Sequence, residues 1–574
     1  FHGLDRFEAR KLIIKKLKDT GSLVKIENIK NKVPYGDRSN TIIEPFLTEQ
    51  WFVDAKKLSK KPIKIVKEGK TTFFPSNWSK TFFQWMSDIE PWCISRQIWW
   101  GHRIPAWYDE NGNIFVAESE KDAVKLAKKK NKNKQFKLRQ ETDVLDTWFS
   151  SALWPFATLG WPKKTEELNK FYPTSVLVTG FDIIFFWVAR MLMMGNYFRK
   201  NTPFHKVYVH ALVRDEKGQK MSKSKGNVID PLDLINEYGA DSLRFTLISM
   251  ASPGRDVKLS KDRVTGNRNF ITKIWSANNF LKLNNCKLDK KINLTSIKLP
   301  INHWIYNEFI KTQNLITKNI EIFRFDEAAR YAYQFVWHSY CDWYLEFLKP
   351  IFNSKNKNEI REAKAFSSFM MANILRILHP FIPFFTENLW SLNAYKKIFN
   401  NYLISSSWPD FKIINKFSKN QNNINDLIEI ISNIRSTKAE LKITPKLYCD
   451  IFFDDKSGKL KKLVNKNINL IKQVGRVNNV LTTKIRDKNS IDILVLKEKL
   501  SLNFNEDVNL GSQKERILQK IQTINKQITS LNNKLKNKAY VTNAPKEIVQ
   551  NDKNLVKELT IEDKKLRSIV SSIN

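Results

Sequence analysis

The sequence predicts a parallel α/β part, then an all-α bundle, a small α/β unit and an antiparallel coiled coil at the C-terminal end. Strand-like and helical segments alternate up to about residue 227, which is typical of a parallel sheet covered by helices. Helical periodicity dominates residues 266 to 408. Farther on, apolar residues repeat at the heptad spacing of a coiled coil, at Ile517, Ile521, Ile524, Ile528, Leu531 and Leu535.

The composition is that of a large basic protein. A chain of 574 residues can form several cores, and we expect roughly three to five domains. The net charge of +39 favours a polyanionic partner, with nucleic acid as the first choice. No apolar run reaches the roughly 20 residues of a membrane span. The four cysteines are too scattered for a zinc element, so we expect free thiols in a reducing cytosol: Cys93, Cys286, Cys341 and Cys449.

The first segment predicts a helix over residues 4 to 17 that ends at Gly21. The chain starts with Phe1 inside a continuous pattern, so we expect it to be the C-terminal part of a longer protein. A block that is dense in tryptophan follows, and such blocks mostly pack in a core. Its members are Trp78, Trp85, Trp92, Trp99, Trp100 and Trp107.

The middle of the chain predicts an antiparallel helical bundle. Its helices are expected over residues 270–283, 301–322, 326–348 and 362–378. A polar linker is expected at residues 417–423. The small α/β unit then has a helix at 425–441 and strands at 447–453 and 491–495.

The last segment predicts a helical hairpin, because Asn543, Ala544 and Pro545 interrupt the heptad pattern. Residues 512 to 574 hold thirteen Lys or Arg and six Asp or Glu. This excess of positive charge suits contact with nucleic acid. The alternative is a solvated coiled coil that only dimerises.

The most specific motif is Lys220-Met221-Ser222-Lys223-Ser224, on a loop between a predicted strand at 207–213 and a predicted helix from Asp230. Ammonium groups can offset the charge of a polyphosphate, and hydroxyl and backbone N–H groups can complete its contacts. A mobile loop can also close over a nucleotide. The alternative is a solvated basic loop.

Together with residues 226–231, this loop resembles the second signature of class I aminoacyl-tRNA synthetases. Over essentially the whole chain, further stretches resemble the valyl-tRNA synthetases in order and spacing. They are residues 33–38, 92–107, 143–154, 179–187, 239–246, 268–270, 341–344 and 379–384.

This resemblance implies five regions. They are the exit of an inserted editing domain (1–40), the C-terminal half of a Rossmann-type catalytic domain (41–265), an anticodon-binding bundle (266–415), a connecting α/β unit (416–505) and a tRNA-binding arm (506–574). It also implies ATP-dependent activation of valine to valyl-adenylate and transfer to valine tRNA, with editing of mischarged threonine by the full-length enzyme. Mg²⁺ would accompany ATP, and no zinc is expected. The implied full-length enzyme is a cytoplasmic monomer without membrane contact.

The resemblance also assigns site residues. Lys220 and Lys223 would be catalytic by stabilising the triphosphate. The complete ATP-binding set is Lys220, Met221, Ser222, Lys223, Ser224 and His210. The valine and adenylate set is Trp148, Asp182, Ile183 and Trp187. The two tryptophans could instead pack in a core, whereas a carboxylate in the apolar run around Asp182 is costly to bury without a partner.

The chain departs from the family in one respect. None of its seven histidines lie three apart, so the first class I signature, His-x-Gly-His, is absent. We therefore expect this chain to be inactive alone. Two alternatives remain open: a split or decayed tRNA-binding subunit without catalysis, and an isoleucyl-tRNA synthetase. The latter commonly ends in a cysteine-ligated zinc element, which this sequence lacks.

Overall fold

The computed structural model describes residues 1–36, 39–130, 136–222, 226–254, 256–289, 292–414, 417–454, 458–481, 490–504, 510–537, 540–541 and 546–572. The chain forms two compact units, each built from separate stretches of sequence. Unit 1 comprises Phe1–Lys67, Phe83–Tyr172 and Phe185–Pro203. Unit 2 comprises Glu68–Phe82, Pro173–Ile184 and Phe204–Asn574.

Unit 1 begins with helix α1 (Arg6–Asp19), which confirms the predicted first helix. The Asp5 carboxylate caps it by accepting a hydrogen bond of 2.9 Å from the Phe7 backbone N–H. At the other end, the N–H of Thr20 bonds back to the last turn. None of the α1 side chains is buried.

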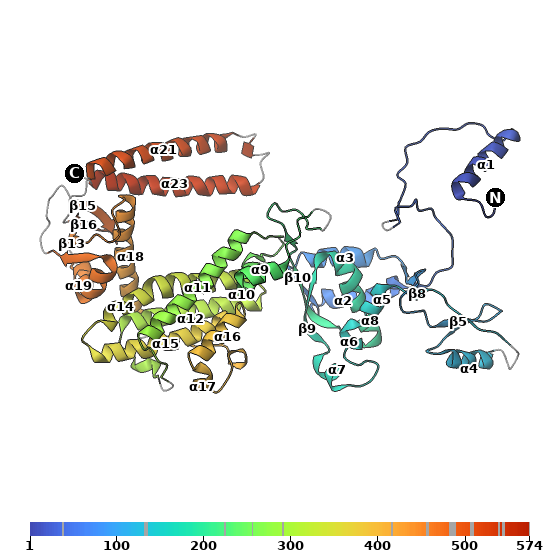
Figure 1. The fold of residues 1–574 in the computed structure, drawn as a ribbon, viewed down its shortest axis with the longest axis horizontal. Coiled ribbons are helices and arrows are strands. Elements are labelled where there is room, and N and C mark those ends of the chain that lie inside the picture. Colours follow the sequence, from blue (N-terminus) through green and yellow to red (C-terminus); the bar gives the residue numbers. More distant parts are fainter. Residues whose placement is uncertain are drawn as a thin grey trace. The chain divides into compact units, whose positions relative to one another are not determined.

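The centre of unit 1 is a group of helices packed through apolar side chains. Helix α2 (Ala55–Lys67) packs against α8 (Arg190–Phe198), and the short helices α5 (Thr147–Ser151), α6 (Trp154–Ala157) and α7 (Glu166–Phe171) lie in the same unit (Figure 1). Along α8, Met191, Leu192 and Met193 are almost completely buried. The π-helical segment η2 (Ile184–Ala189) leads directly into α8.

Short strands attach a small subdomain to these helices. Strand β1 (Phe52–Val53) pairs with β3 (Trp92–Cys93), and β4 (Ser95–Arg96) pairs with β8 (Val144–Leu145), both antiparallel. The subdomain itself has a sheet in the order β6-β5-β7. Its strands are β5 (Ala106–Tyr108), β6 (Ile114–Val116) and β7 (Arg139–Gln140), and α4 (Glu120–Lys130) packs on them through a small apolar core.

Unit 2 contains the predicted parallel sheet, in the order β2-β10-β9. Strand β10 (Phe204–His210) lies between β2 (Thr72–Phe74) and β9 (Thr174–Gly180) and runs parallel to both. Its centre, Val207, is completely buried and pairs with Phe73 on one side and Leu177 on the other. The predicted strand at 207–213 is therefore partly wrong, because β10 ends at His210 and a new strand, β11 (Val213–Arg214), pairs with β12 (Val257–Lys258).

The helical bundle follows the predicted pattern closely. Its main helices are α10 (Ala240–Met250), α11 (Lys261–Leu283), α12 (Pro300–Glu321), α13 (Phe325–Gln334), α14 (Leu345–Phe352), α15 (Lys357–Leu378) and α16 (Pro383–Leu392). The helix predicted for 326–348 is interrupted by a π-helical segment, η5 (Phe335–Tyr344). One hydrophobic core extends from Phe245 in α10 through the bundle to the C-terminal helices.

The first helix of the small α/β unit starts earlier than the predicted residue 425. Helix α18 (Ser418–Glu440) includes most of the expected polar linker at 417–423, so that prediction was wrong. The reason lies in Phe417, which is completely buried and stacks on His303 at 3.7 Å between ring centroids. This contact anchors the chain where the helix begins. The sheet of this unit has the order β14-β13-β16-β15, with β13 (Cys449–Asp454), β14 (Val477–Val480), β15 (Ser490–Val495) and β16 (Glu498–Phe504).

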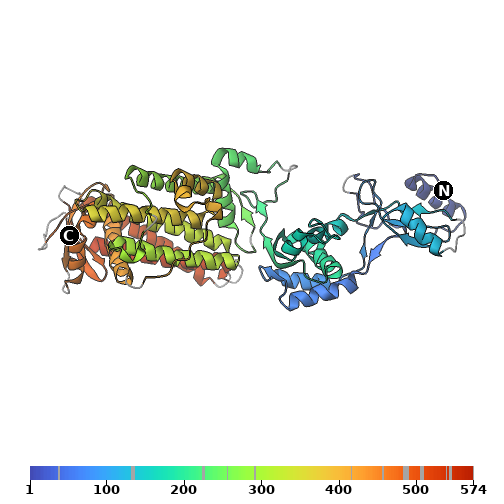
Figure 2. The same cartoon turned by 90° about the horizontal axis from the view of Figure 1, so that it is seen from below.

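The two last helices, α21 (Leu510–Lys536) and α23 (Lys546–Ser572), pack along each other. Figure 1 shows them side by side, and in Figure 2, which is seen from below, they are largely hidden behind the helices of the bundle. Ion pairs join Lys520 to Glu562 at 2.7 Å and Lys534 to Asp552 at 3.1 Å. Because the residue numbers run in opposite directions along the two pairs, the helices are antiparallel.

Within the part of the chain that the structure describes, one helical stretch, Phe181–Phe198, is long and apolar enough to cross a membrane by length and composition alone. Of this 18-residue stretch, 56% is buried inside the structure, as expected for a helix in a protein core. Asp182 and Arg190 also interrupt its apolar sequence. We therefore interpret this stretch as part of the core.

Candidate active site

The structure brings together the two segments of unit 1 that carry the predicted valine-site tryptophans. Trp148 lies on α5 and stacks on Phe186 of η2, with 5.6 Å between ring centroids. Trp187, also on η2, donates a hydrogen bond of 3.2 Å from Nε1 to the backbone oxygen of Ser151 at the end of α5. Both tryptophans are only partly buried. Part of each ring surface therefore remains accessible to solvent.

Asp182 and Ile183 belong to unit 2, in the short helix η1 (Phe181–Ile183) that follows β9 directly. Asp182 is exposed, so the expectation that its carboxylate is buried within the apolar run was wrong. Strand β9 ends at Gly180, and the chain then turns the carboxylate out of the apolar run. The two residues approach closely, since a Cβ atom on Gly180 would lie only 2.6 Å from Asp182 Oδ1.

His210 lies beside Asp182 at the same edge of the sheet. It is the last residue of β10 and pairs in register with Gly180 at the end of β9. The Cβ position of Gly180 is 3.7 Å from His210 Cε1. The His210 ring is exposed, and its Nδ1 lies 2.9 Å from the Ala211 backbone oxygen. Ligands of open α/β sheets bind outside the carboxyl ends of parallel strands, and both side chains lie at such an end.

Asn227, which the sequence did not single out, closes the base of the loop that carries residues 220–224. We call this segment the lysine loop. Its Oδ1 accepts a hydrogen bond of 2.9 Å from the Ser222 N–H. Its Nδ2 donates to Asp215 Oδ2 at 2.8 Å and to the Lys220 backbone oxygen at 3.3 Å. The pKa of Asp215 is lowered, chiefly by its bond from Asn227 and then by the backbone N–H of Gln219. The spacing of motifs in the sequence does not reveal that this side-chain amide bonds to both sides of the loop.

Among the predicted residues of the loop itself, Lys220 is exposed, and Met221 and Ser222 are partly buried. Lys223 and Ser224 lie outside the described residues. Lys220 also forms an isolated antiparallel bridge with Arg214, which joins the loop to β11.

Asp256 anchors this region to the rest of unit 2. Its Oδ1 accepts a hydrogen bond of 3.3 Å from the Leu212 N–H, and its Oδ2 forms an ion pair with Arg214. The contact holds β11 beside β12 and interrupts the strand that the sequence predicted. The loop thus starts from a fixed base.

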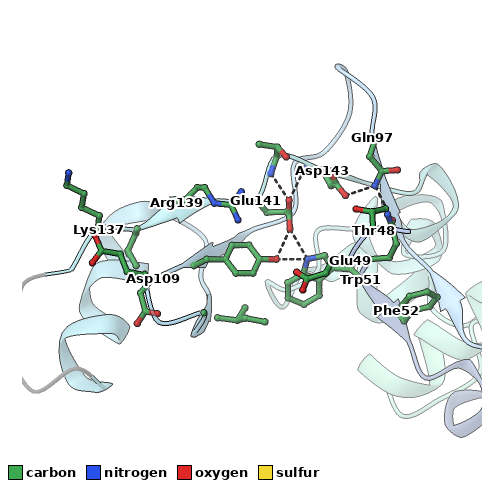
Figure 3. Close-up of a pocket in the computed structure, with 17 residues that line it drawn as sticks. Thr48, Glu49, Trp51, Phe52, Gln97, Asp109, Lys137, Arg139, Glu141 and Asp143 are labelled. Atoms are coloured by element: carbon green, nitrogen blue, oxygen red, sulfur yellow. Dashed lines mark hydrogen bonds between the residues drawn. The ribbon is translucent and has the colours of Figure 1, made fainter. Parts of the chain in front are cut away.

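A separate cavity of about 1180 Å³ lies in unit 1, between the segment at residues 48–52 and the β5-β6-β7 subdomain (Figure 3). At its centre, Glu141 Oε2 accepts hydrogen bonds from the Tyr108 hydroxyl at 2.6 Å and from Trp51 Nε1 at 3.2 Å. Burial acts to raise the pKa of Glu141, but these bonds and those from backbone N–H groups lower it overall. The residues that line this cavity include none of the predicted site residues, so we interpret the network as a structural clamp.

Comparison with known families gives three matches in the order that the sequence predicted. Residues 7–260 match tRNA synthetases class I (I, L, M and V), residues 302–453 match the anticodon-binding domain of tRNA ligase, and residues 509–574 match the valyl tRNA synthetase tRNA binding arm. Together with the parallel sheet and the lysine loop, these matches define the class as class I tRNA synthetases. The coarse order of catalytic, anticodon-binding and C-terminal domains is thereby confirmed.

Similarity to individual relatives identifies the family within this class. The chain is 55% identical over 551 residues to a valine–tRNA ligase of Pelagibacter ubique (strain HTCC1062), covering 96% of this chain and 62% of the relative. It is 44% identical over 596 residues to a valine–tRNA ligase of Rhizobium meliloti (strain 1021), covering 100% of this chain and 63% of the relative. The chain belongs to the valine–tRNA ligase family.

The chain thus spans less than two thirds of the length of these curated relatives. Among solved structures, it is similar to Mycobacterium tuberculosis methionyl-tRNA synthetase in complex with methionyl-adenylate. That similarity has a TM-score of 0.48 and 14% identity, and covers 63% of this chain and 66% of that one.

Proposed function

We propose that the natural protein containing this chain attaches valine to valine tRNA in an ATP-dependent reaction. A valine carboxylate oxygen attacks the α-phosphorus of ATP, and the bond to the β-phosphate oxygen breaks to release pyrophosphate. A hydroxyl of the terminal tRNA adenosine then attacks the acyl carbon, and AMP leaves. The observation that supports this proposal best is the 55% identity to a valine–tRNA ligase over 96% of the chain.

The lysine loop would act on the first step. Negative charge builds on the triphosphate as the α-phosphorus is attacked, and Lys220 and Lys223 would stabilise it. Mg²⁺ enters with ATP as part of the substrate. The remaining members of the ATP-binding set, Met221, Ser222, Ser224 and His210, would shape the loop and the adjoining strand end. The clamp at Asn227 supports this role, because it fixes where the loop starts and ends.

The amino-acid set would recognise valine by two kinds of contact. Trp148, Trp187 and Ile183 offer apolar surface for a branched aliphatic side chain. Asp182 offers a carboxylate for the ammonium group, and its exposure at the end of β9 leaves it free of burial cost. An apolar pocket rejects a threonine hydroxyl only weakly, so a second, hydrolytic site in the full-length enzyme would remove mischarged threonine.

We assign the remaining regions to tRNA. The bundle at 266–415 would bind the anticodon region, the unit at 416–505 would connect it to the arm, and the helical hairpin at 506–574 would contact the tRNA backbone. Residues 1–40 would be the exit of the editing domain, and 41–265 the C-terminal half of the catalytic domain. The net charge of +39 supports a polyanionic partner. We also propose a cytoplasmic, monomeric enzyme.

A non-catalytic tRNA-binding subunit is the second candidate, because this chain lacks the His-x-Gly-His signature. Valine-dependent ATP–pyrophosphate exchange separates the two. We expect the natural protein to exchange with valine, and to exchange with isoleucine at least about a hundredfold less efficiently. We expect the isolated chain to bind valine tRNA without exchange. Absence of valine-dependent exchange in the natural protein would contradict the proposed enzyme and favour the second candidate.

A further inference from the structure

An ionic cluster in unit 1, in which Asp146 and Arg190 are buried and Arg96 is partly exposed, lies directly beside the segments that carry the two predicted valine-site tryptophans. At its centre is Asp146, the residue before α5, which is only 5% exposed. Its Oδ2 accepts a hydrogen bond of 3.0 Å from Trp92 Nε1. The same oxygen lies 3.3 Å from Arg96 Nη2 and 3.5 Å from Arg190 Nη1. One carboxylate thus faces two guanidinium groups and an indole N–H.

Arg190, the first residue of α8, is held mainly by aromatic rings. Only 7% of its surface is exposed, and its guanidinium carbon lies 3.5 Å from the Trp92 ring centroid. The same carbon lies 5.5 Å from the ring centroid of Phe185 and 5.9 Å from that of Phe186. Its Nη1 is buried without a hydrogen bond to any described residue. Burial lowers the pKa of Arg190 to about 10, so the group still carries its charge at neutral pH.

Such a cluster is an inefficient way to pack helices. Charged groups lose hydration when they are buried, and apolar residues of similar size often stabilise a core as well or better. The cation–π contacts recover only part of that loss. The arrangement is therefore better explained by what it positions than by the stability that it adds.

The cluster ties together the two segments that carry the predicted tryptophans. Asp146 stands two residues before Trp148, and Arg190 stands three residues after Trp187. Phe186 joins both features, because it contacts the Arg190 guanidinium and also stacks on Trp148. The bond from Trp187 Nε1 to the Ser151 backbone oxygen closes the other end of α5. Helix α5 is thus held at both ends against η2 and α8.

We propose that Asp146 and Arg190 are positioning residues that fix the placement of Trp148 and Trp187, and thereby set the discrimination of valine from smaller aliphatic amino acids. This inference rests on the proposed function and deepens it. Contacts in an apolar pocket depend steeply on separation, so a small displacement of either ring would weaken the fit to a branched side chain. The binding of a smaller competitor would be weakened less.

The test uses Arg190→Lys and Asp146→Asn in the natural protein. ATP–pyrophosphate exchange is measured with valine and with 2-aminobutyrate, which lacks one methyl group of valine. We expect the KM for valine to rise by about fivefold or more, and the KM for ATP to change less than about twofold. The kcat/KM ratio of valine to 2-aminobutyrate should fall by about fivefold or more. The double variant should show a ratio little lower than that of either single variant, since both substitutions disrupt one cluster.

The chain offers a control in Arg376 of α15, a partly buried arginine whose guanidinium group also lies against aromatic rings. Its guanidinium carbon lies 4.7 Å from the Phe399 ring centroid and 5.5 Å from that of Trp390. We expect Arg376→Lys to lower the melting temperature but to leave the ratio of valine to 2-aminobutyrate unchanged. If the cluster variants raise both KM values equally, or if Arg376→Lys lowers the ratio as much, the inference is overturned.

Two further measurements keep the test decisive. If Arg190→Lys fails to fold, Trp92→Phe removes the N–H donated to Asp146 and should lower the ratio in the same direction; an unchanged ratio would overturn the inference. Positioning is also read without activity, from ¹⁹F resonances of 5-fluorotryptophan assigned by Trp148→Phe and Trp187→Phe. Those two resonances should shift in Arg190→Lys and not in Arg376→Lys. Unshifted resonances overturn the inference even where valine is activated, whereas absence of valine activation in the unmodified protein overturns the proposed function instead.

Discussion

Asn227 Nδ2 donates a hydrogen bond of 2.8 Å to Asp215 Oδ2 across the base of the lysine loop. The same side-chain amide also bonds the N–H of Ser222 and the backbone oxygen of Lys220. One residue therefore joins the strand-side end of the loop to its helix-side end. A loop with a closed base can move over a nucleotide while its start and end stay in place.

Removal of this clamp should weaken ATP binding more than it weakens the fold. We expect Asn227→Ala to raise the KM for ATP by roughly three- to tenfold, the value of one or two hydrogen bonds. The measurement is the ATP dependence of valine-dependent exchange, together with the melting temperature. Asn293→Ala is the control, because that side chain caps only the short helix at residues 294–296. An unchanged KM for ATP in Asn227→Ala would contradict the clamp.

The positive charge of the lysine loop should affect the rate of valine-dependent exchange more than the conformation of the loop does. We expect Lys223→Ala to lower the rate of valine-dependent exchange by about a hundredfold or more, because it removes charge stabilisation that is strongest in the transition state. Lys217, two residues into the turn between Asp215 and Gln219, is the matched control. Lys217→Ala should change the rate by less than about twofold. Equal rates for the Lys223 variant and the unmodified enzyme would refute the role given to Lys223.

The fold could be predicted well where local periodicity decides it. The helix expected at 301–322 is observed as α12, at Pro300–Glu321, because a long helix that packs on one face repeats its apolar residues every three or four positions. The parallel sheet was predicted from the alternation of strands and helices. The π-helical segment η5 was not, because its wider turns change the spacing that identifies a helix.

Contacts between distant residues limited the prediction of the site. The strand expected at 207–213 ends at His210. Asp256, more than forty positions farther along the sequence, accepts hydrogen bonds from the Leu212 N–H and from Arg214. Asp182 is exposed because of where β9 ends, which the apolar run around it does not reveal. The pairing of Asp146 with Arg190 is of the same kind. Motif spacing located the loop and the tryptophans, but not the residues that hold them.

Asp182 should affect valine more than ATP. We expect Asp182→Asn to raise the KM for valine by about tenfold, because it removes a charge-assisted contact to the ammonium group, with little change in the KM for ATP. Since Asp182 is exposed, the melting temperature should stay nearly constant. Exchange assays at varied valine and varied ATP give both KM values. Equal increases in the two would indicate contact with the ribose instead.

The helical hairpin should bind tRNA through its exposed lysines. Deletion of residues 512–574 would also expose buried core residues such as Ile517 and Ile521, so substitution is the sharper test. We expect the triple variant Lys526→Gln, Lys536→Gln and Lys557→Gln to weaken tRNA binding. The slope of log affinity against log salt concentration should flatten by about 0.9 for each phosphate that the variant no longer neutralises.

The control for the hairpin variant carries the same change of net charge elsewhere. Lys121→Gln, Lys128→Gln and Lys129→Gln alter three exposed lysines of α4 in unit 1. Filter binding or fluorescence anisotropy at several salt concentrations should give an unchanged slope for this control. Adenylate formation should be unchanged in both triple variants. Equal slopes for the two would show that the hairpin contributes only general charge.

His379, between α15 and α16, should make stability depend on pH on the acid side. Its Nδ1 lies 2.8 Å from Thr386 Oγ1, and burial lowers its pKa below the ordinary 6.5, although Glu387 and Asp241 act to raise it. Below about pH 6.5 the unfolded chain therefore binds this proton more readily than the folded chain, so the free energy of unfolding falls as pH decreases. Above that range both states are neutral at this residue and it adds no pH dependence.

We expect His379→Gln to reduce the difference in melting temperature between pH 7.5 and pH 5.5 by about 1 °C or more. His205→Gln, at an exposed histidine of β10, should leave that difference unchanged, and parallel curves for His379→Gln and the unmodified chain would contradict the prediction.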